Sequence, residues 1–149
     1  MALAGAILTT DMVPPDTWTS YTPSWTASTT DPTNFTASGY YAKMGNTYFV
    51  KALFTPGASF TAGSGSYRFG LPTATDGFLG LEQSIGTGIL RDTSGPTRYH
   101  LIIMPSASGV STVIPMYSAT TGTLTAVTNS APVAMTNGDY ISMDVCFFA

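Results

Sequence analysis

The run Thr47-Tyr-Phe-Val-Lys-Ala-Leu-Phe-Thr55 decides the fold of this chain. It is rich in aromatic and aliphatic residues, and their alternation predicts an extended strand with two different faces. One face carries Tyr48, Val50, Ala52 and Phe54. The other face carries Phe49, Lys51 and Leu53, so it too is half apolar. Such a strand predicts a sheet that buries one of its faces in a core.

Three later segments repeat this pattern, namely Arg98 to Met104, Val110 to Tyr117 and Asp139 to Phe148. In the last of them, one face carries Ile141, Met143, Val145 and Phe147. No segment has a 3.6-residue apolar stripe longer than two turns, and no heptad repeat is present. We therefore expect roughly eight to ten short strands, at the spacing of a sandwich.

Glycine, proline and asparagine residues lie where hairpins need turns, because they supply a positive or a fixed φ. The predicted turns are Gly45-Asn46, Pro56-Gly57, Gly63-Ser-Gly65, Asp76-Gly77, Ser94-Gly-Pro96, Thr121-Gly122 and Asn137-Gly138. The chain of 149 residues is long enough for one domain. The sequence thus predicts an all-β, single-domain antiparallel β-sandwich, jelly-roll-like, over residues 21–149, preceded by an extended N-terminal arm over residues 1–20.

The predicted arm has an apolar head, Met1 to Leu8, and then the segment Val13-Pro14-Pro15-Asp16. Paired prolines exclude a continuing helix and favour extended backbone. The arm can leave its own domain and add a strand to a partner or fill a groove in it. It can also be a tail tucked onto the same sandwich. The candidate interface residues in and beside the arm are Leu3, Ile7, Leu8, Met12, Val13, Trp18, Tyr21 and Trp25.

Charged residues make up only 9% of the chain, against roughly 25% in an average soluble domain. A net charge of −3 gives a lone monomer little colloidal protection, so we expect much of the surface to be covered in an assembly. The five cations are scattered, which argues against nucleic-acid binding. Residues 1–8 are too few to span a bilayer and lack the positive flank of a signal peptide, so we expect neither export nor a membrane partner.

The candidate chemical groups are few, and we expect no enzyme, no cofactor and no metal site. His100 is the only histidine, and it lies in a strand pattern, where a structural histidine is the usual case. Cys146 stands among Val145, Phe147 and Phe148, which predicts a buried, inert thiol. Asp139 follows Asn137-Gly138 and is best explained as a turn acid. A long-range pair of carboxylates stays open, although the chain has one glutamate.

Ten aromatic residues carry the more informative pattern: Trp18, Tyr21, Trp25, Tyr40, Tyr41, Tyr48, Phe49, Tyr67, Phe69 and Tyr99. Exposed rings can stack on sugars, anchor a protein interface, or pack in the core with a hydroxyl reaching a partner. Trp18 and Trp25 flank the start of the sandwich, where an interface role suits them.

The order of several short motifs resembles a family of small β-sandwich modules of tailed bacteriophages, especially those of actinobacteria. The motifs are Tyr21-Thr-Pro-x-Trp25-Thr-Ala, Gly39-Tyr-x-x-x-Gly45-x-Thr, Thr55-x-Gly57, Gly63-x-Gly65-x-Tyr67-x-Phe69-x-Leu71-Pro72, and Pro132 ahead of Gly138-Asp139-x-Ile141. Together they cover residues 21–148. The segment between Trp25 and Gly39 and the ending Val145-Cys-Phe-Phe-Ala149 depart from the usual pattern of that family.

This resemblance implies a virion structural protein that assembles as a homotrimer. A sandwich with only an arm is similar in layout to head-decoration (cement) proteins, which bind the major capsid protein on the outer surface of the capsid and stabilise its lattice. The alternative that the resemblance implies is a tail-tip or tail-fibre module that binds a host surface glycan or protein. Other virion proteins are further possible partners in either setting.

Overall fold

A long hairpin of β3 (Thr33–Met44) and β4 (Thr47–Thr61) forms one side of the molecule. The two strands turn at Gly45-Asn46, as the sequence predicts, and Gly45 has a φ of 59°. Val50, Ala52 and Phe54 are buried, whereas Lys51 and Leu53 are exposed. The alternation predicted for residues 47–55 is therefore confirmed.

The last strand of the chain, β10 (Tyr140–Phe148), lies between β4 and β6 (Gly86–Asp92) and pairs antiparallel with both. Its buried residues are Ile141, Met143, Val145 and Phe147. This is the face that the sequence assigns to the core. A terminal strand in the middle of the sheet joins the N-terminal half of the chain to the C-terminal half.

The computed structural model describes residues 17–75, 83–107, 109–119 and 122–149. The remaining strands are β1 (Thr19–Tyr21), β2 (Trp25–Ala27), β5 (Tyr67–Gly70), β7 (Thr97–Pro105), β8 (Thr112–Ser118) and β9 (Leu124–Ala126). All ten belong to one antiparallel sheet in the order β1-β3-β4-β10-β6-β7-β8-β5-β2, with β9 beside β8. Within the described residues there is no helix, hence none long and apolar enough to cross a membrane. The all-β prediction is confirmed.

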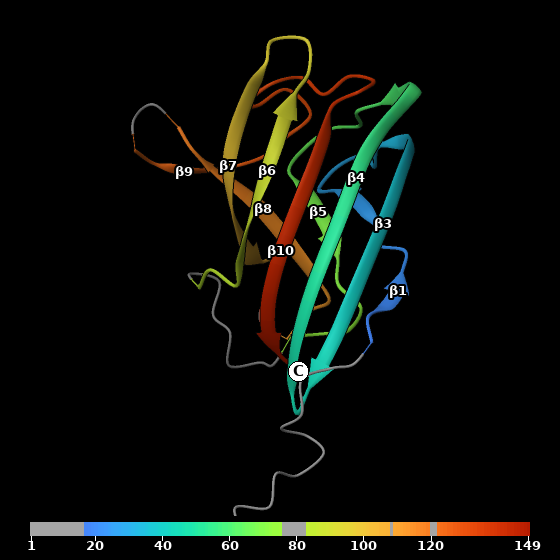
Figure 1. The fold of residues 1–149 in the computed structure, drawn as a ribbon. Helices are drawn as coiled ribbons and strands as arrows, with labels where there is room; N and C mark the ends of the chain where they lie inside the picture. Colours follow the sequence, from blue (N-terminus) through green and yellow to red (C-terminus); the bar gives the residue numbers. More distant parts are fainter. Residues whose placement is uncertain (1–16, 76–82, 108, 120–121) are drawn as a thin grey trace, which may run out of the picture.

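The two layers of this sandwich-like fold are the two halves of one continuous sheet. β4 and β5 are far apart in the strand order, yet the Phe54 and Phe69 rings stack with centroids 4.0 Å apart. The sheet must therefore curl until its ends face each other, and β5 lies behind β4 and β10 in Figure 1. The core fills the space between the two halves.

Trp25 on β2 is the centre of this core and is only 2% exposed. Five aromatic rings have centroids 5.1–5.9 Å from its indole, namely Phe35, Phe54, Phe60, Tyr67 and Phe69. The Trp25 Nε1–H has no hydrogen-bond acceptor among the described residues. Aromatic rings surround the indole, and an N–H can interact weakly with a ring face. Burial also raises the pKa of Tyr67 to about 12, and the Tyr67 hydroxyl donates to the Ala62 carbonyl at 3.0 Å.

The seam between the two ends of the sheet is closed by residues 21–25. β1 and β2 follow one another in the chain but lie at opposite ends of the strand order. The Ser24 carbonyl accepts the Gly70 N–H at 2.9 Å, and the Tyr21 hydroxyl donates to the Gly70 carbonyl at 3.4 Å. The Tyr21 ring covers Gly39, where a Cβ would come within 2.3 Å of it. Partial burial raises the pKa of Tyr21 above its usual value.

The predicted turn at Pro56-Gly57 is wrong, because both residues lie inside β4. Pro56 pairs with Phe35 at a shift of register in β3, where Asn34 has a φ of 58°. A bulge tolerates a residue that lacks an N–H, so the proline does not end the strand. The turn predicted at Asp76-Gly77 lies outside the described residues, and so does Thr121 of the turn predicted at Thr121-Gly122. The predicted boundary between residues 20 and 21 falls within β1, whose Thr19 and Ser20 pair with β3.

Two aspartates hold the turn between β6 and β7. The buried Asp139 carboxylate accepts the backbone and hydroxyl hydrogens of Thr93 at 2.8 and 2.9 Å, and those of Thr136 at 2.7 and 3.1 Å. It thereby ties this turn to the loop before β10, a turn role of the kind the sequence indicates. Asp92 accepts the hydroxyl and backbone hydrogens of Ser94 and the Gly95 N–H, and these bonds, the Ser94 hydroxyl first, lower the pKa of Asp92.

Replacing Trp25 by alanine should lower the free energy of unfolding by about 3–5 kcal/mol, because it leaves a cavity where the two halves of the sheet meet. Trp25→Phe should cost less, since a ring remains and the buried indole N–H is removed. Trp18→Ala is the matched control and should cost less than about 1 kcal/mol, because Trp18 is half exposed. Urea unfolding measures all three. Equal losses for Trp25→Ala and Trp18→Ala would contradict this account of the core.

The Asp92 contacts predict a pH-dependent share of stability. Because folding lowers the pKa of Asp92, its contribution is present above the ordinary value of 3.8 and is lost as the pH falls through the lowered value. Asp92→Asn should therefore be less stable than the wild type at pH 7, and the difference should shrink below about pH 4. Unfolding curves recorded between neutral and acidic pH measure it. A difference that stays constant with pH would contradict the assignment.

Candidate interaction surface

The solvent-facing side chains of β1, β3, β4, β10 and β6, together with Trp18 just before β1, form the surface that we call the outer face. Strand register sets these side chains in rows across the sheet. One row runs through Phe49 and Cys146, with the buried Ala42 opposite Phe49, and the next runs through Tyr40, Lys51 and Asp144. The inner side of the same strands is the core, so the outer face is supported by the most extensively paired part of the sheet.

Large apolar side chains are exposed on this face. Trp18 is 47%, Tyr40 53%, Leu53 42% and Phe148 58% exposed. The half-buried Phe49 and Ile89 lie on the same side of the sheet. Aromatic residues are enriched at protein interfaces, and contiguous apolar patches mark interaction sites. Exposed apolar side chains gathered in this way are typical of an interaction surface.

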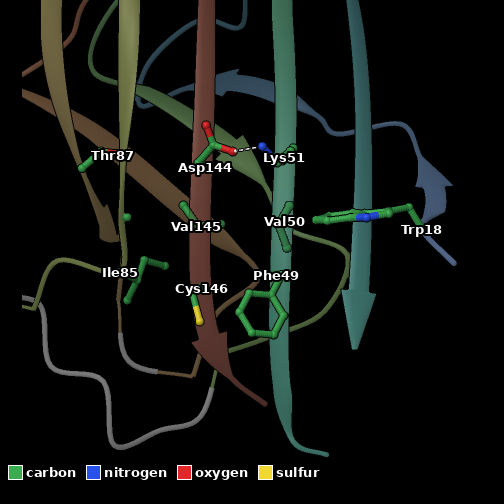
Figure 2. A pocket seen from close by; sticks show the side chains of 10 residues that line it. Trp18, Phe49, Val50, Lys51, Ile85, Thr87, Asp144, Val145 and Cys146 are labelled. Carbon is green, nitrogen blue, oxygen red and sulfur yellow. Dashed lines mark ion pairs between the residues drawn. The ribbon is translucent and has the colours of Figure 1, made fainter. Parts of the chain in front are cut away.

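The outer face is hollowed into an open groove of about 400 Å³ between Trp18 and β6. Figure 2 shows the Trp18 indole reaching across β3 toward β4, with Phe49 and Cys146 next to each other on the floor. Ile85 and Gly86 form the far side of the groove. The size is that of a typical ligand pocket, about 300–1,000 Å³. The lining is predominantly apolar side chains, so the groove suits an apolar occupant.

A second, smaller hollow of about 220 Å³ lies alongside, lined in part by Tyr40 and Leu53. Lys51 and Asp144 line both hollows and pair with each other, Nζ to Oδ1, at 3.0 Å (Figure 2). Both of these side chains are largely exposed, so the pair contributes little to stability. It supplies instead one donor and one acceptor on a surface that also carries the polar side chains of Thr87 and Ser142.

The eight predicted interface residues lie in different surroundings. Leu3, Ile7, Leu8, Met12 and Val13 lie outside the described residues. Trp18 lies on the outer face and forms a wall of the groove. Tyr21 is half-buried at the seam. Trp25 is buried in the aromatic core, so its predicted place in an interface does not fit its surroundings.

Several residues of the outer face are missing from the predicted set, above all Tyr40, Leu53 and Phe148. The sequence did indicate Leu53, because Phe49 and Leu53 make the second face of residues 47–55 half apolar. The prediction of a buried Cys146 is wrong, because Cys146 is exposed. Val145 and Phe147 point inward, and strict alternation turns the thiol between them toward solvent.

The remaining candidate groups have other surroundings. His100 is exposed on β7, opposite Ile89 of β6. Asp31 accepts the Ala27 N–H at 2.9 Å, and Asp92 and Asp139 belong to the turn contacts. In the part of the chain that the structure describes, no three His, Cys, Asp or Glu side chains are grouped so that they could hold a metal ion.

Comparison of the chain with known protein families, with curated proteins and with solved structures finds no match. The resemblance to phage structural modules therefore depends on the order of the sequence motifs alone. The geometry of the outer face is the independent observation from which a function can be argued.

Proposed function

We propose that this protein is a non-enzymatic structural component of a tailed-phage virion that acts by binding other proteins. Its place is the outer surface of the capsid, where it forms a homotrimer, binds the major capsid protein and stabilises the lattice. The observation that carries this proposal is the exposed apolar outer face, with Trp18, Tyr40, Leu53 and Phe148 on a rigid sheet.

The low charge of the chain supports the same proposal. A domain with 9% charged residues and an exposed apolar face is poorly protected against association as a free monomer. Covering that face with copies of itself or with capsid subunits removes apolar area from water. On a shell, each contact can be weak, because many copies linked through one lattice bind with avidity.

A second candidate is a tail-tip or tail-fibre module that binds a host surface glycan or protein. The observation that favours it is the pair of exposed rings, Trp18 and Tyr40, beside the donor and acceptor of Lys51 and Asp144. Aromatic rings stack on sugars, and a charged pair can hydrogen-bond sugar hydroxyls. The two candidates differ in how many copies a virion carries.

The test is the number of copies of this chain per virion of the phage that encodes it, by quantitative mass spectrometry against the major capsid protein. Hundreds of copies in a simple ratio to the capsid subunit are the expected result. A handful of copies, in multiples of three, would overturn the capsid placement and favour the tail. Absence of the chain from purified virions would contradict both candidates.

A further inference from the structure

The groove between Trp18 and β6 begins at the residue where the N-terminal segment joins the sheet. We infer that the apolar segment Ala2–Leu8 of the same chain binds in this groove and covers Phe49 and Cys146. The sequence leaves two arrangements open for the arm, either binding to a partner or packing on its own sandwich. This inference is the second arrangement. The inference concerns the isolated chain and does not depend on the proposed place in a virion.

The chemistry of the groove matches that of the segment. Phe49, Ile85, Val145 and Cys146 provide an apolar lining, and the charged pair Lys51–Asp144 stands at one end. The segment Ala2-Leu-Ala-Gly-Ala-Ile-Leu8 contains no charged side chain and offers three large aliphatic ones. Its small residues let the backbone approach the sheet closely. An apolar peptide therefore satisfies this groove better than a polar or charged ligand would.

The geometry of the chain allows the contact within one molecule. Residues 9–17 separate the segment from Trp18, and nine extended residues span at most about 30 Å. From β1 to β6 the sheet crosses four strand spacings, about 19 Å in all. The connector can therefore bring the segment over the groove floor. A tether of this length also keeps the segment at an effective concentration in the millimolar range, which no free peptide matches at ordinary concentrations.

The position of Cys146 provides the probe, because the lone thiol lies on the groove floor and an occupant would shield it. The rate of reaction of Cys146 with a thiol reagent should be about tenfold or more slower in the wild type than in a variant lacking residues 2–16. The double substitution Ile7→Asp and Leu8→Asp should raise the rate in the same way. Circular dichroism checks that each variant folds. If the shortened chain does not fold, the double substitution alone tests whether the segment shields Cys146.

The matched control is Thr9→Asp with Thr10→Asp, which adds the same charge next to the apolar run and should leave the slow rate unchanged. Protection should also be unchanged over an about hundredfold dilution, because binding within one chain does not depend on concentration. Equal rates in the wild type and the arm variants would overturn the inference. So would protection that disappears on dilution, which would mean that a neighbouring chain supplies the arm or that a second copy covers the groove. None of these results would alter the copy number in virions, so the two proposals fail separately.

Discussion

The contact that the rest of the structure depends on is the packing of Trp25 between the two halves of one sheet. β4 and β5 are not neighbours in the strand order, so no ladder of backbone hydrogen bonds holds them face to face. Packing of side chains holds them together, and the rings around Trp25 come from β3, β4 and β5. Because β1 and β2 are joined by only three residues, this packing also brings the two ends of the sheet together at the seam.

The same curl explains why the outer face stays uncovered. Each strand has two faces, and a sheet closed upon itself uses only the inner one. On most proteins, charged side chains cover much of the surface that faces solvent. Here Lys51 and Asp144 form the only ion pair among the described residues. Tyr40, Leu53 and Phe148 are left where solvent would normally meet charge. Exposed apolar side chains on a rigid sheet favour association with a partner over a free monomer.

The alternation of residues 47–55 and 139–148 was enough to predict the all-β fold and the inward set of both strands, because a period of two is a local property. The turns at Gly45-Asn46, Ser94-Gly-Pro96 and Asn137-Gly138 followed from their turn residues for the same reason. Pro56 misled the prediction, since only the pairing partner, bulged at Asn34, makes a strand proline acceptable. The burial of Trp25 could not be predicted either, because it requires knowing that distant strands face each other. Cys146 was misjudged from its apolar neighbours, although alternation alone would have placed it outside.

The central claim is that the outer face is an interaction surface, and sedimentation equilibrium of the wild type beside Leu53→Asp tests it most directly. Leu124→Asp is the matched control, since Leu124 is 40% exposed against 42% for Leu53 but lies on β9, away from the outer face. We predict a trimer for the wild type and for Leu124→Asp, and dissociation toward the monomer for Leu53→Asp. A wild type that stays monomeric at every concentration, or two variants that assemble equally well, would contradict the account.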